Sequence, residues 1–209
     1  MRVRDAKKEK LIKQKALQIM VKDGFDGFSM HKLAKASSVS PATLYIYFKD
    51  KEDLILQVYM DVNKRMSDAT LKDFSPEMSF SEGLRKQWLN RANYSLKHTD
   101  EMQLLEQIRY SPLHEKALKC VDPAFRDSMQ LFVTNAIQNK QLVEIPFEVF
   151  WSIAYAPLYN LIKFHITGKK KNGEDFVFNE ATMNHTLELV LKALTPDKIS
   201  SKKMNFKLK

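Results

Sequence analysis

Hydrophobic residues recur three and four positions apart along most of this sequence, and the strict alternation typical of half-buried strands is nearly absent. This spacing places the apolar side chains of each segment on one side of a helix. Glycine and proline are few, 5 and 7 in 209 residues, which suits long uninterrupted helices. The sequence therefore predicts an all-α fold with a three-helix N-terminal head on a larger helical domain (about nine helices).

The N-terminal segments carry clear start and stop signals. A first helix over about 4–22 is followed by Asp23-Gly24, where glycine supplies a left-handed stop. Ser29 is placed to cap a helix over 30–36, and Ser40-Pro41 opens another over about 41–46. Only residues 37–39 separate these two short helices, so the segment is predicted to be a helix-turn-helix.

A long helix over about 50–71 follows, and the chain is divided by function at its start. Residues 1–49 are predicted to form the head, and residues 50–196 a helical domain that begins with this stiff connector. Residues 197–209 are expected to be a basic flexible tail. Pro157 is expected to kink a strongly apolar helix over 146–166, because proline removes one backbone hydrogen bond.

The charge of the chain narrows the choice of partner. The 34 Lys and Arg residues outnumber the 25 Asp and Glu residues, for a net charge of +9, and basic residues crowd the start. A basic excess favours a polyanionic partner such as nucleic acid. The single cysteine, Cys120, excludes an intramolecular disulfide and fits a reducing compartment. Neither a leader peptide nor a membrane-spanning segment is recognised, so a cytoplasmic protein without a membrane partner is expected.

Residues 28–55 read FSMHKLAKASSVSPATLYIYFKDKEDLI and resemble the DNA-binding signature of the TetR/AcrR family of transcriptional regulators. The matching positions occur in the family's order: Leu33-Ala34, Val39-Ser40, Leu44-Tyr45, Tyr47-Phe48, Lys51 and Leu54. The rest of the chain resembles the family only in helix number and length. Ser37-Ser38 stands where the family usually has Ala-Gly, and a serine in the left-handed conformation costs about 1 kcal/mol.

The resemblance implies that the second short helix enters the major groove of DNA, which is about 12 Å wide. Its capping residue and the residues that would face the bases are Ser40, Pro41, Ala42, Thr43 and Tyr45. Residues expected near phosphates are Ser29, His31, Tyr47, Lys49 and Lys51. Two alternatives stay open, since Tyr47 could be core and His31 a solvated surface residue. The basic start is either an arm in the minor groove or a solvated helix face: Arg2, Arg4 and Lys7.

The family's C-terminal domain usually dimerises through its last two long helices and encloses a small-molecule pocket. The resemblance therefore implies a homodimer through the helices near 146–166 and 179–194, with an apolar stripe of Leu187, Val190, Leu191 and Leu194 in the interface. Aromatic and methionine side chains are candidates for ligand binding: Trp88, Met102, Phe125, Met129, Phe132, Trp151, Tyr155 and Tyr159. Such a lining would favour a lipophilic or planar ligand, although these residue types are more often plain core.

Together these features predict a DNA-binding transcriptional regulator, a repressor released from a palindromic double-stranded operator by an unknown small-molecule effector. The alternative is a helical protein-interaction regulator of the same fold that does not respond to a small molecule. An enzyme is not expected, because no common metal-ligand spacing, phosphate-binding loop or nucleophile motif occurs. No cofactor and no metal site are predicted.

Overall fold

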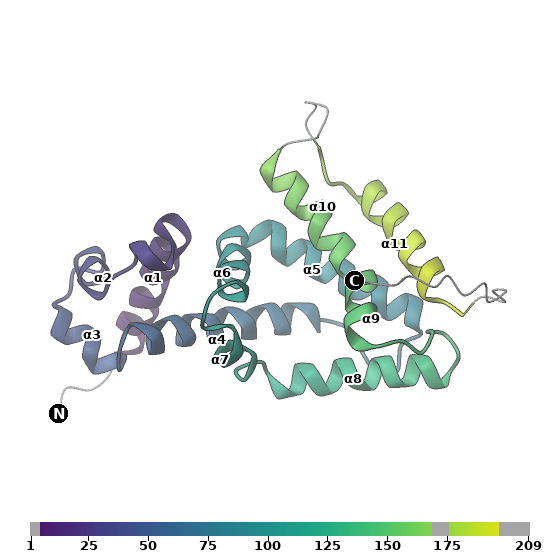
Figure 1. The fold of residues 1–209 in the computed structure, drawn as a ribbon, viewed down its shortest axis with the longest axis horizontal. Coiled ribbons are helices and arrows are strands. Elements are labelled where there is room, and N and C mark those ends of the chain that lie inside the picture. Colours follow the sequence, from purple (N-terminus) through teal and green to yellow (C-terminus); the bar gives the residue numbers. More distant parts are fainter. Residues whose placement is uncertain (1–4, 169–175, 197–209) are drawn as a thin grey trace, which may run out of the picture. The chain divides into compact units, whose positions relative to one another are not determined.

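The computed structural model describes residues 5–168 and 176–196, and within them it contains eleven α-helices and no strand (Figure 1). The predicted all-α fold class is confirmed. The chain packs as two compact units. The first unit comprises Met1–Asp73 with Leu89–Asp127, and the second comprises Phe74–Trp88 with Ser128–Lys209. Arg2 and Arg4 of the suggested arm and the predicted tail at 197–209 lie outside the described residues.

Helix α1 (Ala6–Gly27) opens the N-terminal head. Asp5 caps it, because the Asp5 carboxylate accepts hydrogen bonds from the backbone N–H groups of Lys7 (2.9 Å) and Lys8 (3.2 Å). Gly24 has φ +71°, in keeping with the predicted helix stop, but the chain makes a further helical turn up to Gly27. Side chains at four-residue spacing are buried along the helix: Ile12, Ala16 and Met20.

Three further helices begin close to where the sequence predicts: α2 (Met30–Ala36), α3 (Pro41–Tyr47) and α4 (Lys51–Thr70). The residue before each helix caps it with a side-chain oxygen, which satisfies a backbone N–H that would otherwise lack a partner. In these caps a side-chain oxygen accepts a hydrogen bond from a backbone N–H three residues later: Ser29 from Lys32 (3.2 Å), Ser40 from Thr43 (3.2 Å) and Asp50 from Asp53 (2.8 Å).

One hydrophobic core joins the head to two later helices, α6 (Thr99–Arg109) and α7 (His114–Leu118). Leu104 of α6 belongs to the same cluster of buried side chains as Leu44 and Phe48 of the head. By packing, the head therefore forms one unit with α4, the C-terminal half of α5 (Phe80–Lys97), α6 and α7. The predicted boundary between a head over residues 1–49 and a domain over residues 50–196 is a division by function, and it stays a prediction.

The second unit contains the N-terminal half of α5, most of α8 (Pro123–Gln138), α9 (Phe147–Ala154), α10 (Ala156–Thr167) and α11 (Glu180–Leu194). Its centre is aromatic. The ring of Phe132 meets the edge of Phe74 at 5.1 Å between centroids and stacks on Phe80 at 5.9 Å. Each such ring pair adds about 0.5–1.5 kcal/mol of stability beyond that gained by burying the apolar surface of the rings.

The segment predicted as one kinked helix over 146–166 is in fact two helices, α9 and α10. Tyr155 separates them with φ −125° and ψ −31°, and Pro157 lies in the first turn of α10. Inside a helix a proline lacks the required N–H and clashes with the carbonyl four residues earlier, whereas the first turn tolerates it. Pro157 therefore starts a new helix instead of kinking a continuous one.

Candidate nucleic-acid interface and effector region

A tight turn connects α2 to α3. The N–H of Val39 donates to the carbonyl oxygen of Ala34 (3.0 Å) and the N–H of Ser38 to that of Lys35 (3.2 Å), the pair of bonds that makes a Schellman motif. Ser38 has φ +53°, so a serine occupies the left-handed position. Ser37 is buried and its hydroxyl has no hydrogen-bond partner. Both serines carry a free-energy cost that Ala-Gly would avoid.

Helix α3 turns one face to the core of the head and the other to solvent. Leu44 is fully buried, whereas Ala42 is exposed and Tyr45 keeps 57% of its surface accessible. Pro41 and Thr43 are partly buried at the helix start. The residues predicted to read bases are therefore positioned with Ala42 and Tyr45 as the most accessible side chains.

A hollow of about 430 Å³ opens beside α3. Tyr47 borders it, although this side chain is only 6% exposed, and its hydroxyl oxygen accepts a hydrogen bond from the N–H of Asp5 (3.2 Å). Tyr47 therefore packs in the core and also reaches the rim of the hollow. The other lining residues are Asp5, Lys8, Ser38, Val39, Ser40, Thr43 and Ile46.

Five of the lining residues are not in the predicted DNA-binding set: Asp5, Lys8, Ser38, Val39 and Ile46. Ile46 could have been found, because it lies four residues after Ala42 and so shares its face of α3. Lys8 lies on α1, and only the tertiary structure brings it beside α3.

Lys51 has an internal contact. Its Nζ donates a hydrogen bond to the carbonyl oxygen of Phe25 (2.7 Å) and lies 5.8 Å from the centroid of the Phe28 ring. This contact ties the end of α1 to the start of α4. The remaining predicted phosphate-binding residues are exposed on the head: Ser29, His31 and Lys49.

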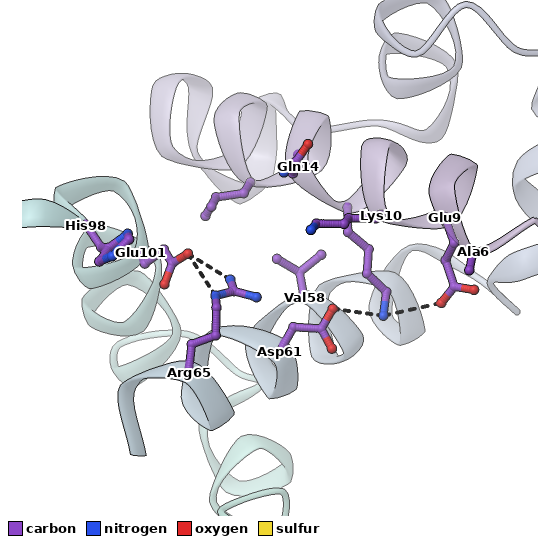
Figure 2. Close-up of a pocket in the computed structure, with 11 residues that line it drawn as sticks. Ala6, Glu9, Lys10, Gln14, Val58, Asp61, Arg65, His98 and Glu101 are labelled. Carbon is purple, nitrogen blue, oxygen red and sulfur yellow. Dashed lines mark hydrogen bonds and ion pairs between the residues drawn. The ribbon is translucent and has the colours of Figure 1, made fainter. Parts of the chain in front are cut away.

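A second hollow, of about 670 Å³, lies between α1, α4 and α6 (Figure 2). Opposite charges pair across it. The Nζ of Lys13 on α1 lies 3.0 Å from the Asp61 carboxylate on α4, and Arg65 on α4 pairs with Glu101 on α6 at 2.8 Å. One partner of each pair is half exposed, so water screens the attraction and each pair contributes at most about 1 kcal/mol to stability.

Tyr94 of α5 extends this network, since its hydroxyl donates a hydrogen bond to Glu101. Burial, and next the hydrogen bond to Glu101, raise the pKa of Tyr94 well above its ordinary value. The hydroxyl therefore remains a donor at neutral pH. Tyr94, Glu101 and Arg65 link α5, α6 and α4 within the first unit.

The eight predicted ligand-binding residues are divided between the two units. Met102 and Phe125 belong to the first unit, and the other six belong to the second. Phe132 is fully buried among aromatic rings, whereas Met129, Trp151 and Tyr159 are partly buried.

Two of these residues hold the second unit together through hydrogen bonds. The indole N–H of Trp88 donates to the carbonyl oxygen of Ala154 (2.7 Å), and the hydroxyl of Tyr155 donates to Oε1 of Gln87 (2.7 Å). All four residues are buried. Trp88 and Tyr155 thus have structural partners of their own.

The apolar stripe expected in the dimer interface faces the interior of the second unit. Leu187, Val190, Leu191 and Leu194 are all buried within a single chain. Their periodicity reflects packing of α11 against α9 and α10. The exposed apolar residues of α10 and α11 are different ones: Phe164, Ile166 and Leu189.

Membrane-spanning helices and metal-binding clusters are both absent from the part of the chain that the structure describes. None of its helices has the length and apolar character needed to cross a membrane. Among residues 5–168 and 176–196, no three His, Cys, Asp or Glu side chains are grouped so that they could hold a metal ion.

Two short helices joined by a tight turn, with a capped and solvent-facing second helix, define a helix-turn-helix head of the DNA-binding class. Residues 12–58 match the family described as bacterial regulatory proteins, tetR family. Residues 12–58 therefore form a DNA-binding domain of the TetR family, and the chain is similar to HTH-type transcriptional regulators over most of its length.

One relative is similar in sequence, and two solved structures are similar in fold. An uncharacterised HTH-type transcriptional regulator of Haemophilus influenzae is 26% identical over 144 residues, which is 69% of this chain and 75% of that protein. The crystal structure of a TetR-family transcriptional regulator from the same species is similar in fold, with a TM-score of 0.75 at 23% identity over 92% of this chain and all of that one. The transcriptional regulator FadR of Bacillus subtilis, solved in complex with stearoyl-CoA, gives a TM-score of 0.68 at 17% identity over 87% of this chain and 97% of that chain.

Proposed function

We propose that this protein is a DNA-binding transcriptional repressor that works as a homodimer and is released from a palindromic operator by a small-molecule ligand. One observation carries the proposal: α3 is capped by Ser40, held by a Schellman turn and exposed along the face that bears Ala42 and Tyr45. A helix presented in this way fits the major groove.

The proposed contacts with DNA are of two kinds, to base edges and to phosphates. We assign base contacts to Ala42, Thr43 and Tyr45, because a methyl, a hydroxyl and an aromatic ring can all meet base edges. Pro41 would approach the same groove at the helix start. Phosphate contacts are assigned to a larger set around α3: Lys8, Ser29, His31, Ser40, Tyr47, Lys49 and Lys51. Lys51 already donates to Phe25, so its share in phosphate binding would be added to a structural one.

The homodimer is assigned to α10 and α11, where Phe164 and Leu189 are exposed apolar residues. Apolar residues left on the surface of one chain favour burial against a second copy. A two-fold dimer would require a palindromic operator. Such a protein acts on chromosomal DNA, which places it in the cytoplasm.

Two observations favour a ligand-responsive repressor over a regulator that works only through protein contacts. A protein of the same fold binds stearoyl-CoA, which supports a lipophilic effector. In addition, Tyr94, Glu101 and Arg65 connect α5 and α6 to α4, the helix that follows the head. A ligand that binds one arrangement of these helices better than another would shift DNA affinity by about 1–3 kcal/mol in typical cases.

Fluorescence anisotropy with labelled fragments of the protein's own upstream DNA tests the DNA-binding part. Ala42→Asp should weaken binding strongly, because a carboxylate would face the bases and phosphates. Ala124→Asp is the matched control: both alanines are exposed and follow the proline that starts a helix, α3 or α8. The affinity should also fall with salt, with a logarithmic slope of about −0.9 for each phosphate contacted. Equal affinities of the two variants would contradict the proposed interface.

A further inference from the structure

The first unit contains polar side chains at positions where a helical protein normally places apolar ones. Asn63 and Ser67 on α4 are 8% and 1% exposed, and Arg91 on α5 is 1% exposed. Arginine is almost never fully buried unless it is paired, and Arg91 has interaction partners within the protein. These residues are absent from the set that the sequence suggests for ligand binding.

The register of α4 and α5 places Arg91 beside the C-terminal half of α4, which carries Ser67. Asn90 of α5 donates hydrogen bonds to the carbonyl oxygens of Thr70 (3.0 Å) and Lys72 (2.7 Å), whereas Tyr94 of α5 bonds Glu101, the partner of Arg65. The two helices therefore run antiparallel here. Arg91, one residue after Asn90, therefore lies between the levels of Thr70 and Arg65, in the stretch of α4 that contains Ser67.

Several buried oxygen atoms in this region have no hydrogen-bond partner. They are Oδ1 of Asn63, Oγ of Ser67 and, on α6, Oε1 of Gln107. Each such atom has lost its hydrogen bonds to water without replacing them, which destabilises the folded chain. Most buried polar atoms in proteins are satisfied, so three on two contacting helices of one unit call for a partner.

Arg91 adds a permanent positive charge to this region. The face of the Phe125 ring lies 5.8 Å from its guanidinium carbon, a cation–π contact that offsets part of the cost of burial. A guanidinium has five N–H donors, so it can bind a carboxylate with two of them and still serve protein partners.

We propose that Arg91, Ser67 and Asn63 bind the carboxylate end of an organic acid that is the effector of this protein. Arg91 supplies the charge and Ser67 a hydroxyl donor, while Asn63 and Gln107 accept hydrogen bonds from a hydroxyl or amide N–H next to the carboxylate. This assignment rests on the proposed ligand-released repressor, but it adds the chemistry of the ligand. An acidic head group is required, whether the remainder of the molecule is an alkyl chain or a planar ring.

The first test needs no ligand. Ser67→Ala removes a buried hydroxyl without a partner, so the melting temperature should stay the same or rise by a few degrees. Thr70→Val is the matched control on the same face of α4, because the Thr70 hydroxyl is also buried but donates to the carbonyl oxygen of Met66 (2.8 Å). This control should lower the melting temperature. If Ser67→Ala lowers it equally, Ser67 serves the fold, and its assignment to a ligand is overturned.

The second test uses acids paired with their neutral amides: salicylate with salicylamide, indole-3-acetate with indole-3-acetamide, and decanoate with decanamide. At least one acid should raise the melting temperature of the full chain while its amide does not, and the identity of that acid separates an aromatic from an aliphatic effector. Arg91→Met should abolish the shift. Lys86→Met is a control for loss of a partly buried positive charge on the same helix. No acid-specific shift, or a shift that persists in Arg91→Met, would overturn the proposal.

A third measurement separates this inference from the proposed function. The stabilising acid is added to the protein bound to operator DNA. Binding of the acid that depends on Arg91 but leaves DNA affinity unchanged would support the site and refute ligand-released repression. Circular dichroism of Arg91→Met confirms that the variant is folded. Replacing a buried charge with an apolar side chain is often neutral or stabilising, so the variant is expected to fold.

Discussion

The indole N–H of Trp88 on α5 donates a 2.7 Å hydrogen bond to the carbonyl oxygen of Ala154, the last residue of α9. The helix breaks at Tyr155, so carbonyl groups at the end of α9 lack the N–H donors that a continuous helix would supply. The indole takes the place of one such donor. A break caused by Pro157 is therefore stabilised by a residue 66 positions earlier in the chain.

Trp88→Phe is expected to lower the free energy of unfolding by about 1–3 kcal/mol, because the Ala154 carbonyl would be buried without a donor. Urea denaturation followed by circular dichroism measures the change. Leu84→Met is a control for altered core shape, since Leu84 is fully buried on the same helix and should tolerate a volume-conserving change. A Trp88→Phe variant as stable as the parent would show that the hydrogen bond adds nothing.

The Schellman turn between α2 and α3 should be improved by two substitutions. Ser38→Gly relieves the φ of +53°, and Ser37→Ala removes a buried hydroxyl without a partner. We expect the double variant to gain about 1–2 kcal/mol in unfolding free energy. Ser81→Gly, at an exposed position of helix α5, is the control, and this variant should lose stability. A loss of stability in the double variant as well would contradict this account of the turn.

Lys51 and Lys49 should behave differently when replaced by alanine. Lys51→Ala breaks the hydrogen bond to the Phe25 carbonyl and should reduce both stability and DNA affinity. Lys49 is exposed, so Lys49→Ala should weaken binding to all DNA sequences alike and leave the melting temperature unchanged. Thermal unfolding and anisotropy on the same samples separate the two effects. An unchanged melting temperature in Lys51→Ala would refute its structural role.

Stability should fall in alkaline solution because of Tyr94. The pKa of Tyr94 is raised in the folded chain by burial and by Glu101, so the folded state holds its proton more tightly than the unfolded state does. The resulting stabilisation is fully present below about pH 10, the ordinary pKa of tyrosine, and is lost as the pH rises through the folded pKa.

Urea midpoints between pH 9 and 11.5 measure this dependence, and Tyr94→Phe should flatten it. Burial also raises the pKa of Tyr59, so the urea midpoint of Tyr94→Phe should still fall somewhat with rising pH. Tyr110→Phe, at a highly exposed tyrosine, should leave the slope as in the parent protein. An identical slope in Tyr94→Phe and the parent would mean that Tyr94 does not contribute.

Leu189→Glu should dissociate the proposed homodimer. Leu189 is 56% exposed on α11, so a carboxylate there would be solvated in the single chain but buried in the interface. Sedimentation velocity should show monomers, and operator affinity should fall because two linked heads bind more tightly than one. Leu118→Glu, at an exposed leucine of α7, should stay dimeric. A parent protein that is monomeric at micromolar concentration would contradict the dimer.

The sequence by itself determined the local structure of the head. Ser29, Ser40 and Asp50 begin helices through hydrogen bonds that span three residues, and such contacts need no distant partner. The left-handed turn at residue 38 follows from the three-residue spacing between two helices. For the same reason, the helix-turn-helix and the family could be recognised from one short segment.

The tertiary structure alone decided which side of each later helix faces inward and which residues meet. A regular stripe such as Leu187, Val190 and Leu191 has the same periodicity whether it packs on its own chain or on a second copy. The candidate effector site illustrates the same limit. Ser67 and Arg91 are ordinary surface residue types whose burial depends on the register of two antiparallel helices, and sequence separation carries no signal of that register.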